Sequence, residues 1–274
     1  MKVSHESPVS ILEYSKEYND FDYCLVHLLH QNAGSPQQLA YNNYYSHARS
    51  LYNREVLLDN SIFELGKAFD PEQFYKSAML IKPNMFIVPD VLEDADGTVE
   101  SWNNFEAKTD DLKKSFYTKS IGAVQGKTWK DLVDCYKFMS DNADMIAISF
   151  DFSYYQAIGY GKTELERFCS GRQRFIADLI NSNVWDWNKP HHLLGCSLAK
   201  EFRYYVDRNV YNIVSCDTSN PIVCAIFGLK YDADYGLSNK PKVKLADLIS
   251  HEFTDEQLDL VKYNTSMFKK IIRR

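Results

Sequence analysis

The stretch SIGAVQGKTWKDLVDCYKFMSDNADMIAISFDF, residues 120–152, decides the fold class of this chain. Its two ends, Ser120–Gln125 and Asp144–Phe152, are short apolar runs of strand length, and Trp129–Ser140 between them has apolar residues at helical spacing. Thr128 and Asp131 form an S/T-x-x-D pattern that is typical of a helix start. A strand, a helix and a second strand in this order predict a β-α-β unit with parallel strands.

The same alternation continues along most of the chain. Further strands are expected at Asp22–His30, Glu55–Asp59, Met85–Val91, His191–Ser197 and Tyr211–Cys216. Further helices are expected at Pro71–Ile81, Thr98–Ala107, Thr163–Asn181 and Leu198–Asp207, and at about 254–274. With an eighth strand near Tyr231–Leu237, the pattern predicts an α/β protein with a (β/α)8 TIM-like barrel, as a single domain over residues 1–274. Residues 1–20 would be a lead-in, and an open doubly wound sheet is the alternative fold.

The composition is that of an ordinary folded protein. The 274 residues include 31 Lys and Arg and 37 Asp and Glu, which gives a net charge of −6, and 45 % of them are hydrophobic. These values exclude disordered, collagen-like and coiled-coil classes. Apolar runs reach only strand length, so no membrane partner is expected, and the first residues lack the apolar core of a secretory signal. Six scattered cysteines without a C-x-x-C pair predict reduced thiols in a cytoplasmic protein, and no metal site.

Acidic side chains follow several of the expected strands. Asp59, Asp90, Asp151 and Asp217 each stand at a strand end, and Gln125 has this place in the stretch quoted above. In a barrel the carboxyl ends of all strands meet at one face, so these side chains are expected to converge there. Neighbouring carboxyl groups raise one another's pKa and serve in general acid–base and nucleophilic chemistry. The alternative for each aspartate is a helix cap or a turn former.

Five segments in this order resemble the motifs of the tRNA-guanine transglycosylases, which are barrel enzymes that exchange a guanine for a 7-deazaguanine. The segments are LDNSIF (58–63), PD (89–90), GAVQG (122–126), KPHHLLG (189–195) and SCD (215–217). The corresponding family motifs are a D-S-G-G-[FY]-Q turn, an Asp on the next strand, a V-Q-G strand end, a K-P-[RY]-x-[LM]-[LM]-G strand and a late segment with the nucleophile. The resemblance extends over about residues 55–220 and implies the barrel fold.

The resemblance also implies a role for each matching residue. Asp217 would be the nucleophile that attacks the sugar C1′, and Asp59 the acid/base for the base nitrogen. The substrate-binding residues would be Asp90, Gln125 and Gly126 at the polar edge of the base, Phe63 and His192 as stacking rings, and Asn60 and Gly195. The alternatives for the two rings are a core aromatic and a structural histidine. Base exchange with retained configuration needs two inversions, and therefore a carboxylate nucleophile and a second carboxyl group that moves the proton.

The chain departs from the family pattern in three places. The zinc-binding C-x-C-x-x-C…H segment has no counterpart, the glycine pair of the turn is Ser61-Ile62, and the G-G-L strand end is Ser149–Asp151. Phe150 would fill space beside the base, and Asp151 would pair with a cationic 7-substituent. A compact chain without the zinc segment is similar to the phage DNA-guanine transglycosylases. This similarity implies that guanine, flipped out of double-stranded DNA, is exchanged for a base such as 7-cyano-7-deazaguanine. The exchange would protect phage DNA from restriction in the host cytoplasm and would need no cofactor.

Cationic side chains near the expected site are the candidates for contact with the nucleic acid. They are Arg49 and Arg54, interleaved with tyrosines in residues 41–54, and Arg167, Arg172 and Arg174 in the long helix after Asp151. The alternative for residues 41–54 is a helix with a half-buried tyrosine face. Three rival functions stay open: exchange in tRNA, hydrolysis of the N-glycosidic bond by the same carboxylates, and nucleic-acid binding without catalysis.

Overall fold

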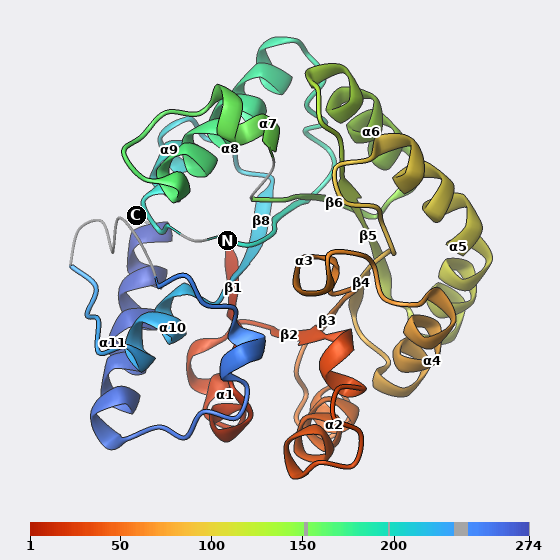
Figure 1. Ribbon diagram of the computed structural model, residues 1–274. Coiled ribbons are helices and arrows are strands. Elements are labelled where there is room, and N and C mark those ends of the chain that lie inside the picture. The colour runs from red at the N-terminus through yellow and green to blue at the C-terminus, as the bar shows by residue number, and fades with distance from the viewer. Residues whose placement is uncertain (151–152, 197, 233–240, 274) are drawn as a thin grey trace. The chain divides into compact units, whose positions relative to one another are not determined.

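A computed structural model describes residues 1–150, 153–196, 198–232 and 241–273. In these ranges eight strands form one parallel sheet in the order β1-β8-β7-β6-β5-β4-β3-β2. Helices follow the strands along the chain, as Figure 1 shows, so the fold class is the predicted (β/α)8 TIM-like barrel. The strands are β1 Lys2–His5, β2 Asp22–Leu25, β3 Val56–Asp59, β4 Met85–Ile87, β5 Lys119–Val124, β6 Met145–Ile148, β7 His191–Leu193 and β8 Ile213–Thr218.

The helices differ widely in length. They are α1 Ser15–Tyr18, α2 Pro36–Ala48, α3 Ile62–Leu65, α4 Pro71–Ile81, α5 Ala95–Phe116, α6 Trp129–Asn142, α7 Ser153–Ile158, α8 Glu164–Asn181, α9 Glu201–Asp207, α10 Asn220–Ile226 and α11 Asp255–Ile272. Short 3-10 turns are η1 Val9–Ile11, η2 Val26–Leu29 and η3 Leu245–Leu248. No helix in the described ranges combines the length and the apolarity that crossing a bilayer requires.

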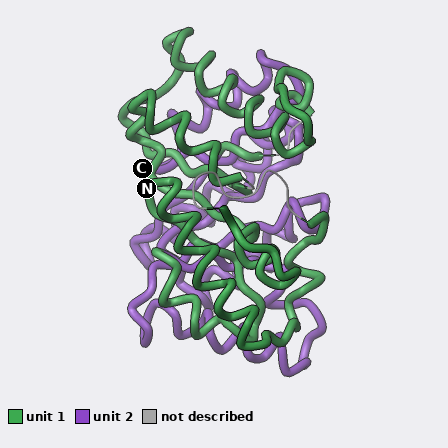
Figure 2. The backbone as a smooth tube through the Cα atoms, turned by 90° about the vertical axis from the view of Figure 1, so that its left-hand side faces the viewer, with its two compact units in different colours: residues 1–20, 148–274 green, residues 21–147 purple. Residues whose placement is uncertain are grey.

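The chain divides into two compact units, residues 1–20 with 148–274 (unit 1) and residues 21–147 (unit 2), which Figure 2 shows in different colours. Each unit has its own core. In unit 2, the rings of Phe74, Phe86 and Phe105 from α4, β4 and α5 pack with centroid distances between 5.8 and 6.5 Å. In unit 1, Ile11 and Tyr18 are part of a cluster with buried residues of α10 and α11.

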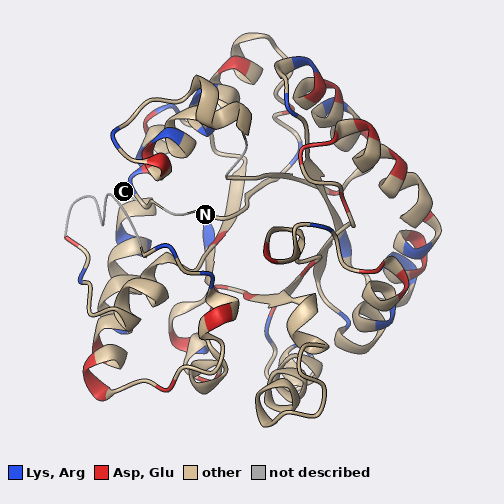
Figure 3. Cartoon of the chain, in the orientation of Figure 1, with Lys and Arg blue, Asp and Glu red and all other residues tan. Residues whose placement is uncertain are grey.

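Local capping explains several helix starts. The Asp70 side chain accepts a hydrogen bond at the start of α4, and Thr128 and Thr163 begin capping boxes at α6 and α8. These side chains satisfy N–H groups that have no partner within the helix, so α4 and α6 begin at the predicted residues. Acidic and basic residues are interspersed along α5 and α6 (Figure 3), so these two helices present mixed charge rather than a basic stripe.

Three predicted elements need correction. The strand expected at Asp22–His30 ends at Leu25, because Val26–Leu29 forms the 3-10 turn η2. The N-terminal segment is not a lead-in, because Lys2–His5 is strand β1 and pairs in parallel with β8. This strand completes the sheet, whereas residues 233–237 of the strand expected at Tyr231–Leu237 lie outside the described residues. Helix α5 extends well beyond the predicted Thr98–Ala107. It extends further because Asp94 caps its first turn and Tyr117, with a left-handed φ of 53°, ends it.

Candidate functional site

Six of the predicted site residues form two hydrogen-bonded groups, one in each unit. The group in unit 2 is centred on Asp90, which follows β4 and is buried. Asn60 Nδ2 donates to Asp90 Oδ1 at 2.7 Å and also to the Val88 carbonyl at 3.1 Å. Gln125 Nε2 donates to Asp90 Oδ2, while Gln125 Oε1 accepts from the Glu93 N–H at 2.8 Å. The polar side chains that end neighbouring strands β3, β4 and β5 are therefore held together, as expected for this unit.

Burial has a strong effect on the ionisation of Asp90. Loss of solvation raises the pKa of its carboxyl group to about 6, although the hydrogen bonds from Gln125 and Asn60 act in the opposite direction. The carboxylate has about four lone-pair sites, and the two amides occupy two of them. Above about pH 6 the group is therefore an anion that can accept further hydrogen bonds from a ligand with adjacent N–H donors.

Asp59 ends β3 and begins a tight turn. Its Oδ2 accepts the backbone N–H of Ser61 at 2.8 Å, and Ser61 Oγ accepts the N–H of His27 at 3.2 Å. Ser61 has φ +60°, in the left-handed region that favours glycine, and stands where the resembled turn has a glycine. The turn leads into α3, on which the Phe63 side chain is 51 % exposed. The alternative of a core position for Phe63 is therefore wrong.

The group in unit 1 is centred on Asp217 of β8, which is 3 % exposed. The backbone N–H of Gly195 lies 3.2 Å from both Oδ1 and Oδ2, and His192 Nε2 lies 3.0 Å from Oδ1. Gly195 has φ +64°, a conformation that glycine adopts without strain and that turns its N–H toward the carboxylate. Both oxygens of Asp217 are thus oriented by donors from the end of β7.

His192 has a different position from the one expected of a stacking ring. The side chain is fully buried, and its Nδ1 lies 2.8 Å from Ser215 Oγ while its Nε2 contacts Asp217. A neutral ring with the proton on Nε2 satisfies both contacts, since the Ser215 hydroxyl then donates to Nδ1. His192 is therefore a structural histidine, the alternative given above, and it fixes the orientation of Asp217. Its ring has no exposed face on which a base could stack.

Phe150 and Arg172 are also buried, so Arg172 does not form the cationic surface that the sequence predicted. Arg172 donates to both oxygens of Glu201 at 2.8 Å, and its guanidinium lies 4.9 Å from the Phe150 ring centroid. Its Nη1 donates to the carbonyls of Ile148 at 3.2 Å and Leu194 at 2.7 Å. The Leu194 carbonyl belongs to the same planar peptide as the Gly195 N–H that binds Asp217, so Arg172 positions this peptide. Asp151 lies outside the described residues.

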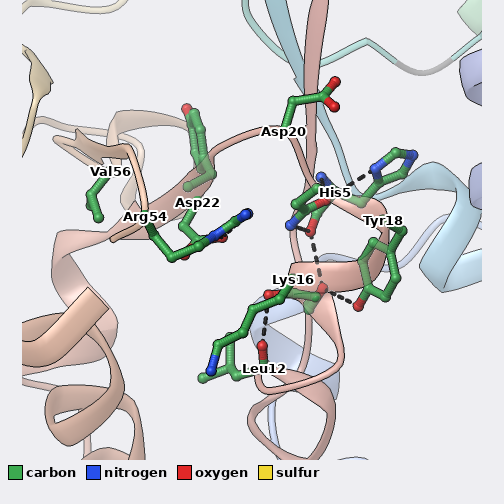
Figure 4. A network of polar contacts seen from close by, with 12 residues as sticks. His5, Leu12, Lys16, Tyr18, Asp20, Asp22, Arg54 and Val56 are labelled. Atoms are coloured by element: carbon green, nitrogen blue, oxygen red, sulfur yellow. Dashed lines mark hydrogen bonds and ion pairs between the residues drawn. The ribbon is translucent and has the colours of Figure 1, made fainter. Parts of the chain in front are cut away.

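Arg49, Arg54 and Arg174 make contacts within the chain. The Arg54 and Asp22 side chains meet (Figure 4), and two nitrogens of Arg54 bind Asp22, with 2.9 Å between Nη2 and Oδ1. Arg49 donates to backbone carbonyls, including that of Phe116 at 2.9 Å. Arg174 is exposed and lies 3.7 Å from Asp178, and Arg167 is half-buried. Among the predicted cations, Arg174 has the greatest access to a phosphate.

The tyrosines of residues 41–54 are part of the structure of unit 2 rather than a stacking surface. Tyr41, Tyr44 and Tyr45 of α2 are buried. The Tyr41 hydroxyl accepts the N–H of Leu25 at 2.9 Å, and the Tyr45 hydroxyl donates to the carbonyl of Tyr23 at 2.7 Å. These bonds fix α2 against β2, so the helical alternative is confirmed for residues 41–48 of this segment.

Two residues of the unit 1 site were not predicted, Ser215 and Glu201, and His192 was predicted as a stacking ring rather than as a partner of Asp217. Ser215 could have been found, because side chains two residues apart on a strand share one face and Asp217 was already a candidate. Glu201 has no comparable signal, since its partner Arg172 is 29 residues away on another helix.

Comparison with models of known protein families gives no match, and comparison with curated proteins gives none either. The residues and their geometry therefore carry the functional argument.

Proposed function

We propose that this chain is a base-exchange glycosyltransferase that replaces guanine in DNA by a 7-deazaguanine through a covalent intermediate on Asp217. The environment of this carboxylate carries the proposal, because the Gly195 N–H and the His192 ring hold both of its oxygens at a strand end. A carboxylate fixed in this way keeps lone pairs for attack on carbon and pays little entropy for orientation. The order of the five resembled motifs is the second support.

The proposed reaction has two displacements at one carbon. An Asp217 oxygen bonds to the sugar C1′ while the C1′–N9 bond breaks, and the departing guanine takes a proton from Asp59. Asp59 then removes the proton from the corresponding nitrogen of the incoming 7-deazaguanine, which attacks C1′ and displaces Asp217. Each displacement inverts the configuration at C1′, so the product retains it.

In this proposal the Asp90 group selects the base. Guanine and 7-deazaguanine share an edge with adjacent N–H donors and an oxygen acceptor, and an ionised Asp90 accepts from those donors. Asn60 and Gln125 hold the Asp90 carboxylate in place by one hydrogen bond each. Phe63, with half of its side chain exposed, supplies a ring for stacking, which is worth about 1–3 kcal/mol per base.

The test is incubation of the protein with a labelled 7-deazaguanine base and either duplex DNA or tRNA. The wild type is expected to place label in DNA and to form a covalent adduct that survives denaturation. Asp217→Asn, which keeps the shape of the side chain but removes its charge, is expected to abolish both. Asp134→Asn is the matched control, because Asp134 is an exposed aspartate paired with Lys130, and it is expected to match the wild type.

The outcomes separate the alternatives. Full exchange by Asp217→Asn contradicts the assignment of the nucleophile. Label in tRNA alone contradicts DNA as the polymer, and release of guanine without incorporation of label indicates a hydrolase.

A further inference from the structure

Ser4 of β1 is a buried polar residue with no role so far. Its side chain has no exposed surface, and no described residue lies within hydrogen-bonding distance of its Oγ. Leaving a buried hydroxyl unpaired costs about 1–3 kcal/mol, and native structures hold few such groups. A partner from outside the chain, such as a bound substrate, would satisfy the Ser4 hydroxyl.

The strand register places Ser4 beside Asp217. Strands β1 and β8 pair in parallel, with Ser4 opposite Asp217 and His5 opposite Thr218. Paired residues of neighbouring strands point to the same face of a sheet, and successive residues point to opposite faces. The His5 ring packs against Tyr18 of α1 and Phe268 of α11, at centroid distances of 5.8 and 5.5 Å; Figure 4 shows its contact with Tyr18. His5 thus faces the helices, and Ser4 lies on the opposite face with Asp217.

The two polar side chains of β8 on this face already have partners. Ser215 and Asp217, two residues apart on β8, both bind the His192 ring, and Gly195 N–H binds Asp217. Ser4 stands outside this network, although it is one strand away, a spacing of about 4.8 Å. Its hydroxyl therefore has unused hydrogen-bonding capacity next to the Asp217 carboxylate.

We propose that Ser4 Oγ hydrogen-bonds to the sugar of the nucleotide on which Asp217 acts, an inference that rests on the proposed function. In an in-line displacement the leaving base lies on the far side of C1′ from the attacking oxygen. The space beside the nucleophile then faces the sugar ring and its oxygens, not the base. A serine hydroxyl donates one hydrogen bond and accepts two, so it suits such oxygens.

The test is Ser4→Ala, studied in the full chain by thermal unfolding and by exchange kinetics. Removal of an unpaired buried hydroxyl is expected to leave the Tm equal to or above that of the wild type. Loss of one substrate hydrogen bond is expected to lower kcat/KM for the polynucleotide about tenfold. The KM for the free 7-deazaguanine base should stay unchanged, because that ligand has no sugar.

Ser7→Ala is the matched control. Ser7 is also a buried serine of the N-terminal segment, but its hydroxyl donates to the His5 carbonyl at 2.9 Å and lies 2.8 Å from the Tyr18 hydroxyl. Its loss is expected to lower the Tm and to leave kcat/KM unchanged, which is the reverse of the result for Ser4.

Three results would overturn the inference: a Tm of Ser4→Ala lowered like that of Ser7→Ala, unchanged polynucleotide kinetics, or a raised KM for the free base. In each of these cases an active wild type leaves the proposed function intact. A wild type that exchanges no base refutes the proposed function itself, and the assignment of Ser4 to a sugar with it.

Discussion

Titration of Asp90 should make the protein less stable as the pH rises from about 4 to about 6. The usual pKa of the carboxyl group is 3.8, and burial raises it to about 6 in the folded protein. Between these values the folded state binds a proton that the unfolded state has released, so raising the pH favours unfolding. The stability that the protonated Asp90 adds is fully present below pH 3.8, the pKa in the unfolded chain, and is lost as the pH rises through about 6, the pKa in the folded protein. The difference corresponds to about 3 kcal/mol in total.

Urea unfolding of the wild type and of Asp90→Asn at several pH values measures this effect. Other carboxyl groups have a lowered pKa in the folded protein. An example is Glu166, whose hydrogen bonds with Lys200 and Thr163 lower its pKa to about 2. These groups titrate equally in the wild type and in the variant. They cancel in the difference between the two free energies of unfolding. From pH 4 to pH 7.5 the wild type is expected to lose about 2–3 kcal/mol relative to the variant.

A second variant should shift the pH range over which stability is lost. Asn60→Ala removes one of the two amides that stabilise the ionised form of Asp90, so the pKa should rise further and the loss of stability should extend to higher pH. A difference between wild type and Asp90→Asn that stays constant from pH 4 to pH 7.5 would refute the reasoning. Such a result would mean that the Asp90 carboxyl group is not desolvated.

Further predictions concern the packing of unit 1. Glu201→Gln leaves the fully buried Arg172 without its anion and should lower the free energy of unfolding in urea by about 3–5 kcal/mol. The double variant Arg172→Met/Glu201→Leu should recover most of this loss, and equal losses in the single and the double variant would contradict the role of the charge. Gly171→Ala should lower stability by more than about 3 kcal/mol, because a Cβ there would lie 2.1 Å from the Tyr155 carbonyl oxygen. Gly228→Ala, where a Cβ meets no atom within 4 Å, should lower stability only by the strain of its left-handed backbone, about 1–2 kcal/mol. A similar loss in Gly171→Ala and Gly228→Ala would show that the close approach of Tyr155 does not cause the loss at Gly171.

The helices that depend on local signals could be predicted. Asp70 followed by proline, and threonine followed three residues later by an acidic residue, act within one turn of the chain, so α4 and α6 begin where the sequence indicates. The β1 strand could not be predicted in this way. Its four residues, KVSH, become a strand only because β8, more than 200 residues later, supplies the hydrogen-bond partners.

In the candidate site too, local signals could be predicted and contacts between distant residues could not. The sequence indicated Asp59, Asp90, Gln125 and Asp217, because polar residues that end apolar strands need only the pattern of the strand itself. It could not indicate that Arg172 is buried, since helical spacing alone does not show which neighbours an arginine meets.

By itself, the sequence determined the alternation of strands and helices after residue 20, the (β/α)8 class and the carboxylates at the strand ends. These features depend on residues within a few positions of one another. Only the tertiary structure decided that His192 holds Asp217, that burial raises the pKa of Asp90, and that Ser4 lies beside Asp217 with its hydroxyl unpaired. Each of these depends on strand register and desolvation, which arise only when distant segments of the chain pack together.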